Sequence, residues 1–94
     1  MSDQPRFIAD VMLGSLAKWL RILGFDTLYF KDIDDRELIK RAKQEQRVLL
    51  TRDTRLVKSK KVAEHILIKA NDAPGQLKEV LKFLPLAPCP VPFF

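Results

Sequence analysis

The sequence predicts an α/β fold, in which a small and mostly parallel central sheet forms the middle layer of a three-layer α/β/α arrangement. Two observations support this prediction. Short apolar runs, each too short for a helix, alternate with longer segments whose apolar residues recur at helical spacing. Their order is strand, helix, strand, helix, strand, strand, helix, and this alternation is typical of parallel sheets with helices on both faces.

The first half of the chain supplies two predicted strands and two predicted helices. Residues 7–10 and 27–30 are short runs with aromatic and β-branched side chains, as strands prefer. The helix between these strands stops at Gly24, a residue that suits a helix C-terminus. The next helix begins with Asp34 and Glu37, at the spacing of a capping box. The apolar face predicted for the first helix consists of Leu13, Leu16, Ala17, Leu20 and Leu23.

The second half continues the pattern. Residues 47–51 and 65–68 are interpreted as strands, and the polar, basic segment 54–61 between them as a short helix or a loop. Residues 71–74 carry an Asn-Asp pair followed by a proline, which is typical of a helix N-terminus. The apolar face predicted for this last helix consists of Leu77, Val80, Leu81 and Leu84.

Length and composition predict one small folded domain. The chain has 94 residues, and its 47% hydrophobic content argues against disorder. We expect residues 1–84 to form the domain and residues 85–94 to be a Pro-rich apolar tail, which suits neither a regular helix nor a central strand. Cys89 is the single cysteine, so a disulfide within the chain is excluded and a reducing compartment fits best. The absence of a signal peptide or a long apolar stretch leads us to expect a cytoplasmic protein.

The charge of the chain predicts an anionic partner. Lys and Arg total 17 against 12 Asp and Glu, for a formal net charge of +5. Excess positive charge indicates a nucleic acid, an anionic membrane or an acidic protein as the partner, and a basic protein without an anionic partner is the alternative. Basic side chains gather after the third predicted strand, where they could contact RNA phosphates or form an ordinary solvated loop. These candidates are Arg52, Arg55, Lys58, Lys60 and Lys61.

Two predicted strands are followed by an aspartate, Asp10 and Asp53. Ligand sites in parallel sheets form beyond the carboxyl ends of the strands, so neighbouring strands would direct both carboxylates into one crevice. Asp35 is the third candidate, because Asp34 is already used by the predicted capping box. Carboxylates suit Mg²⁺ or Mn²⁺, and such ions support phosphodiester hydrolysis. Thr51 could support a carboxylate through a hydrogen bond. The alternative is that Asp10 and Asp53 each cap the following helix.

Several segments of the chain resemble the Mut-7-C family of PIN-like ribonuclease domains. The longest is residues 7–26, and the other matching segments are 34–38, 47–53 and 76–77. The resemblance implies that Asp10, Asp35 and Asp53 are the catalytic, metal-binding carboxylates of a magnesium- or manganese-dependent nuclease. Members of the family usually continue into a zinc ribbon with paired cysteines. Because this chain offers Cys89 alone, we expect no zinc.

The leading hypothesis is therefore a divalent-metal-dependent ribonuclease that hydrolyses RNA phosphodiester bonds at a cluster of aspartates. Two alternatives stay open. The first is a non-catalytic PIN-like module that binds RNA, single-stranded or structured, through its basic residues. The second is a protein-interaction domain whose apolar tail, residues 85–94, docks on a protein partner or a second copy of the chain.

Overall fold

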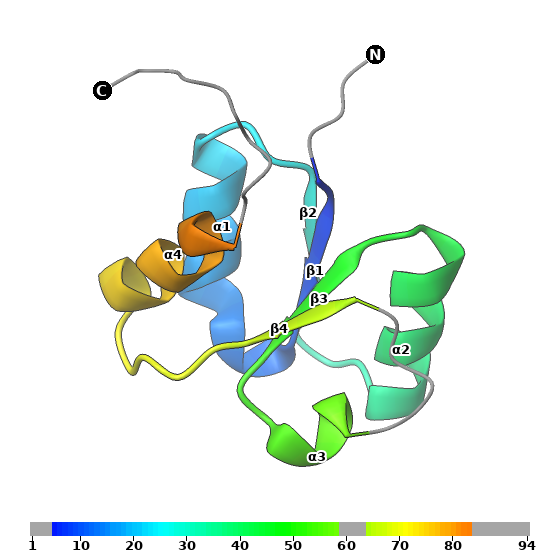
Figure 1. The fold of residues 1–94 in the computed structure, drawn as a ribbon. Coiled ribbons are helices and arrows are strands. Elements are labelled where there is room, and N and C mark those ends of the chain that lie inside the picture. Colours follow the sequence, from blue (N-terminus) through cyan, green and yellow to red (C-terminus); the bar gives the residue numbers. More distant parts are fainter. Residues whose placement is uncertain (1–4, 59–63, 84–94) are drawn as a thin grey trace.

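The computed structural model describes residues 5–58 and 64–83. Their strands form a four-stranded sheet in the order β2-β1-β3-β4, and every neighbouring pair is parallel. Helices lie on both sides of this sheet (Figure 1). The three-layer α/β/α architecture predicted from the sequence is confirmed. The elements are β1 Phe7–Ala9, the 3₁₀-helix η1 Val11–Leu13, α1 Gly14–Ile22, β2 Thr27–Tyr29, α2 Asp35–Gln44, β3 Val48–Thr51, α3 Thr54–Val57, β4 His65–Leu67 and α4 Ala73–Lys82.

Each face of the sheet has its own hydrophobic core. Alternate residues of a strand point to opposite faces, so Phe7 and Ile8 of β1 belong to different cores. Helices α1 and α4 cover one face and α2 and α3 the other, as Figure 1 shows. The first core contains Phe7, Ala9, Leu13, Leu16, Ala17, Leu20, Leu50, Ile66, Ile68 and Val80, and the second contains Ile8, Leu38, Ala42, Leu49 and Leu56.

The helices begin and end at the signals read from the sequence. The Asp34 carboxylate accepts a hydrogen bond from the Glu37 backbone N–H at 2.8 Å, which confirms this side of the predicted capping box. The Glu37 side chain is hydrogen-bonded to Arg41 at 3.2 Å, one turn further along α2. After the C-terminus of α1, Gly24 has φ +96°, a backbone conformation that glycine adopts without strain. The predicted stop of the first helix is therefore confirmed.

The apolar faces of α1 and α4 are narrower than predicted. Leu23 is 46% exposed and Leu81 is 43% exposed, so neither is part of the core. Leu23 continues α1 as its C-cap, with helical backbone angles, so its exposure reflects how far the neighbouring elements extend along this helix. Leu84 lies outside the described residues, as do the predicted tail 85–94 and the end of the segment 54–61.

A buried arginine organises the amino edge of the sheet. Arg47 was expected to be a strand residue, but β3 begins at Val48 and the Arg47 side chain is 6% exposed. Its guanidinium pairs with the carboxylates of Asp26 at 3.0 Å and Glu45 at 2.8 Å. It also donates to the carbonyl oxygens of Phe7 and Asp26, both at 3.1 Å. Arg47 thus joins β1, β3 and the residues before β2 at the edge opposite to the strand-end aspartates.

Candidate functional site

The two strand-end aspartates lie side by side at the carboxyl edge of the sheet. Strands β1 and β3 are parallel neighbours, with Ala9 opposite Leu50. The backbone N–H of Asp10 donates to the Leu50 carbonyl at 2.9 Å, which continues the ladder one step past β1. Asp53 follows β3 at the same edge. The prediction that β1 and β3 are parallel neighbours is therefore confirmed.

Thr51 connects the two aspartates. Its side chain is fully buried, at 0% exposure, between their backbones. The Thr51 hydroxyl donates to Asp10 Oδ2 at 2.7 Å and accepts from the Asp53 backbone N–H at 3.0 Å. The structure therefore contains the hydrogen bond from Thr51 to a carboxylate, and the role of Thr51 in a functional site stays a prediction. Because the hydroxyl uses both its donor and its acceptor capacity, it holds Asp10 and Asp53 in a defined relative position.

Both aspartates also cap the helices that follow them. Asp10 Oδ1 accepts from the Val11 backbone N–H at 2.7 Å, and Asp53 Oδ1 accepts from the Arg55 backbone N–H at 2.9 Å. A carboxylate offers about four lone-pair sites, so these caps leave acceptor capacity on both residues. The capping interpretation is thus confirmed, and it is compatible with metal binding.

The electrostatic surroundings of Asp53 favour its charged form. The hydrogen bond from the Arg55 backbone N–H holds the pKa of the Asp53 carboxyl below the ordinary value of 3.8. The Arg55 guanidinium, 3.5 Å from Asp53 Oδ1, lowers the pKa further, although desolvation acts in the opposite direction. At neutral pH Asp53 is therefore a carboxylate, the form in which an aspartate binds a cation.

Asp35 is the first residue of α2, which begins at the same carboxyl edge of the sheet. Helix α2 follows β2, and β2 is parallel to β1, so the chain enters α2 from the carboxyl edge. Asp34 caps the helix, as predicted, and Asp35 is an exposed residue of its first turn. Within residues 5–58 and 64–83, no group of three or more His, Cys, Asp or Glu side chains is arranged to hold a metal ion. A metal site shared by Asp10, Asp35 and Asp53 stays a prediction.

The predicted phosphate-binding residues differ in how they are held. Arg52 Nη2 donates to the side-chain oxygen of Asn71 at 2.8 Å, and its Nε is buried without a hydrogen-bond partner among the described residues. The Arg55 side chain is 90% exposed, and Lys58 is exposed at the end of α3. Lys60 and Lys61 lie outside the described residues.

Two contributors to this edge were missed by sequence reasoning. Asn71 was interpreted as part of a helix cap, yet Asp72 performs that role by accepting from the Gly75 backbone N–H at 3.2 Å. The presence of two polar residues where one cap suffices was the available signal. The second is Tyr29, whose hydroxyl donates to the Val11 carbonyl at 2.8 Å and steadies the turn after Asp10. Its position at the end of a predicted strand was the available signal.

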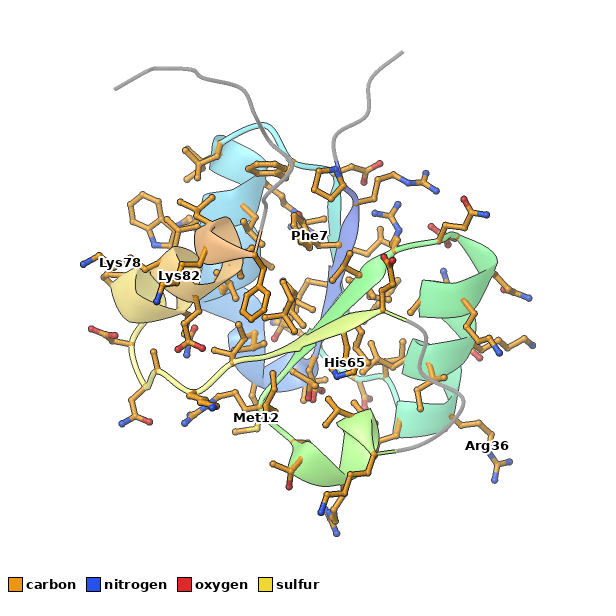
Figure 2. The ribbon with its side chains drawn as sticks, in the orientation of Figure 1. Phe7, Met12, Arg36, His65, Lys78 and Lys82 are labelled. Atoms are coloured by element: carbon orange, nitrogen blue, oxygen red, sulfur yellow. The ribbon has the colours of Figure 1, made fainter. Side chains whose placement is uncertain are left out.

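Figure 2 separates the two edges of the sheet, with Phe7 toward the amino edge and Met12 at the carboxyl edge. Met12, in the turn after Asp10, is 65% exposed, so the surface beside the aspartates is partly apolar. The carboxyl edge thus presents two oriented carboxylates, a buried hydroxyl that links them, and nearby arginines. Oxygen donors of this kind fit Mg²⁺ or Mn²⁺, and magnesium commonly binds through one or two carboxylates together with phosphate oxygens and water.

Comparison with known proteins shows which family the chain belongs to. A family model described as "Mut7-C RNAse domain" matches residues 5–92, nearly the whole chain. No curated protein and no solved structure gives a significant match. No helix among residues 5–58 and 64–83 is long and apolar enough to cross a bilayer. The match includes both strand-end aspartates, the capped start of α2 and α4. The chain belongs to the Mut7-C RNAse domain family.

Proposed function

We propose that this chain is a metal-dependent ribonuclease that hydrolyses RNA phosphodiester bonds at the carboxyl edge of its sheet. The observation that carries the proposal is the linkage of Asp10 to Asp53 through the buried Thr51 hydroxyl, at 2.7 and 3.0 Å, on adjacent parallel strands. Membership of an RNase domain family supports RNA as the substrate. Asp35 is proposed as the third carboxylate, because its helix begins from the same edge.

The proposed cofactor is Mg²⁺ or Mn²⁺. A bound ion of this kind would supply activation of water and stabilisation of the charge that develops on the phosphodiester. The chain supplies the ligands and their orientation. Thr51 and the Val11 N–H hold the two oxygens of Asp10, and the Arg55 N–H holds Asp53 in its charged form. Rigid placement of this kind keeps the cost of reorganisation during the reaction low.

RNA is proposed to bind beside the carboxylates through its phosphates. Arg52 follows β3 and is hydrogen-bonded to Asn71. Arg55 lies in α3, and Lys58 is the residue that ends this helix. Arginine can form paired hydrogen bonds with phosphate, whereas lysine contributes a mobile charge. Lys60 and Lys61 extend the same basic run in the sequence and are proposed to act in the same way. Affinity for RNA should therefore decrease as salt increases.

The test is cleavage of a labelled single-stranded RNA by the purified protein. We expect cleavage with Mn²⁺ or Mg²⁺ and none after addition of EDTA. Asp53→Asn should abolish most of the cleavage, because the amide keeps the shape of the side chain and removes its negative charge. Asp26→Asn is the matched control, since it makes the same change at the amino edge and should leave cleavage near the wild-type level.

The outcomes separate this proposal from its alternatives. Equal cleavage by wild type and Asp53→Asn would place the activity in a contaminant or at another site. Salt-sensitive RNA binding without hydrolysis under any metal condition would contradict the ribonuclease and favour the RNA-binding module. Loss of activity in Asp26→Asn as well would show that net charge or folding, and not the position of Asp53, explains the effect. Urea unfolding of all three proteins checks the folding explanation.

A further inference from the structure

We infer that Asn71 is a positioning residue that holds Arg52 in place to bind an RNA phosphate. The inference rests on the proposed function and assigns a role to a residue of the β4–α4 loop. Arg52 directly follows β3, and Asn71 directly precedes the capping residue of α4. The Nη2-to-Oδ1 hydrogen bond of 2.8 Å joins residues 19 positions apart across the carboxyl edge.

Arg52 is held differently from Arg47, the buried arginine at the amino edge of the sheet. Arg47 is bonded to two carboxylates and two carbonyl oxygens, which satisfy and neutralise its guanidinium. Arg52 has no carboxylate within ion-pair distance among residues 5–58 and 64–83, and its buried Nε–H has no acceptor there. A buried donor without a partner destabilises a fold, so fold stability alone does not favour this arrangement of Arg52. The positive charge of Arg52 is therefore available to an anion.

The chemistry of Asn71 suits this role. A guanidinium has five N–H donors, and Asn71 accepts a hydrogen bond from one of its terminal nitrogens. An amide oxygen restricts the orientation of Arg52 without cancelling its charge, whereas a carboxylate would do both. A neutral partner leaves the positive charge of Arg52 uncompensated, and this charge contributes to affinity for phosphate.

The loop that carries Asn71 is itself held against α4. The Glu79 carboxylate accepts hydrogen bonds from the backbone N–H groups of Lys69 at 2.9 Å and Ala70 at 2.6 Å. The buried Gln76 side chain donates to the Ala70 carbonyl at 3.1 Å. Helix α4 therefore fixes the backbone immediately before Asn71. A side chain on such a loop can restrict a long, flexible arginine, which otherwise loses side-chain entropy when it binds phosphate.

The experiment is a double-mutant cycle on RNA binding. Affinity for a labelled single-stranded RNA is measured in EDTA for wild type, Arg52→Ala, Asn71→Ala and the double variant. We expect about a tenfold loss for Arg52→Ala, close to the lower end of the range for hydrogen bonds to charged groups, and about a threefold loss for Asn71→Ala, within the range of an ordinary hydrogen bond. The double variant should bind like Arg52→Ala, because Asn71 has no effect without Arg52. Gln44→Ala, an amide truncation at the exposed end of α2, is the matched control and should bind like wild type.

A second readout separates positioning from fold stability. Asn71→Asp keeps an acceptor for Arg52 but adds a negative charge, so it should weaken binding at least as much as Asn71→Ala while the fold stays stable to urea. Wild-type affinity in Asn71→Ala would overturn the inference. A further loss in the double variant beyond Arg52→Ala would also overturn it, because Asn71 would then act independently of Arg52. Wild type that does not bind RNA at all would instead contradict the proposed function.

Discussion

Replacing Thr51 with Val should destabilise the fold by about 2.5–4 kcal/mol, although the two side chains have nearly the same shape. Thr51 is 0% exposed, and valine leaves the Asp10 carboxylate without its 2.7 Å donor and the Asp53 N–H without its 3.0 Å acceptor. A hydrogen bond to a charged group contributes about 1.5–3 kcal/mol, and an unpaired, partly buried N–H adds about 1 kcal/mol. No cavity forms, so the loss comes from the missing hydroxyl.

The measurements are urea unfolding and thermal melting of wild type, Thr51→Val and Thr51→Ser, both monitored by circular dichroism. Serine keeps the hydroxyl and removes one buried methyl group, which costs about 1 kcal/mol. Valine should therefore be the less stable of the two variants, with an unchanged m-value and a melting temperature at least about 10 °C below wild type. Thr51→Val as stable as wild type, or more stable than Thr51→Ser, would refute the idea that this hydroxyl organises the edge.

Three further predictions concern Asp53, Arg47 and Gly75. The pKa of Asp53 is lowered in the folded state, so its stabilising contribution is present above the unfolded pKa of about 3.9 and is lost as pH falls through the folded pKa. In urea unfolding at several pH values, the stability of wild type should therefore fall more steeply below pH about 4 than the stability of Asp53→Asn. Arg47→Ala should destabilise the fold by about 1–3 kcal/mol in urea unfolding, because two backbone carbonyls lose their donor. The two carboxylates are more exposed and can be hydrated instead. Unchanged stability would show that these contacts contribute nothing. Gly75→Ala should lower the melting temperature despite its helical position, because the new Cβ would lie 2.6 Å from the Asp72 oxygen that caps α4; a melting temperature at or above wild type would contradict this.

The parts of the fold that local interactions determine were readable from the sequence. A cap such as Asp34 bonds to a backbone N–H three residues away, and an amphipathic face depends on a spacing of three or four residues. The elements, the stop at Gly24 and the two strand-end aspartates were accordingly predicted. Leu23 and Leu81 were predicted to be buried and are exposed. The reason is that periodicity indicates which side of a helix is apolar, and not how far the neighbouring element extends over that side.

Local patterns were therefore sufficient to predict the alternation of strands and helices, the caps, and the candidate carboxylates at the ends of two strands. Which of these residues come into contact depends on the packing of the whole domain. The order β2-β1-β3-β4 places Asp10 against Thr51, 41 positions away, and Arg52 against Asn71, 19 positions away. It also buries Arg47 among partners from three separate segments. These contacts depend on how the strands are arranged and how the helices pack on them, and that arrangement is set by the burial of apolar surface over the whole domain, which no local pattern records.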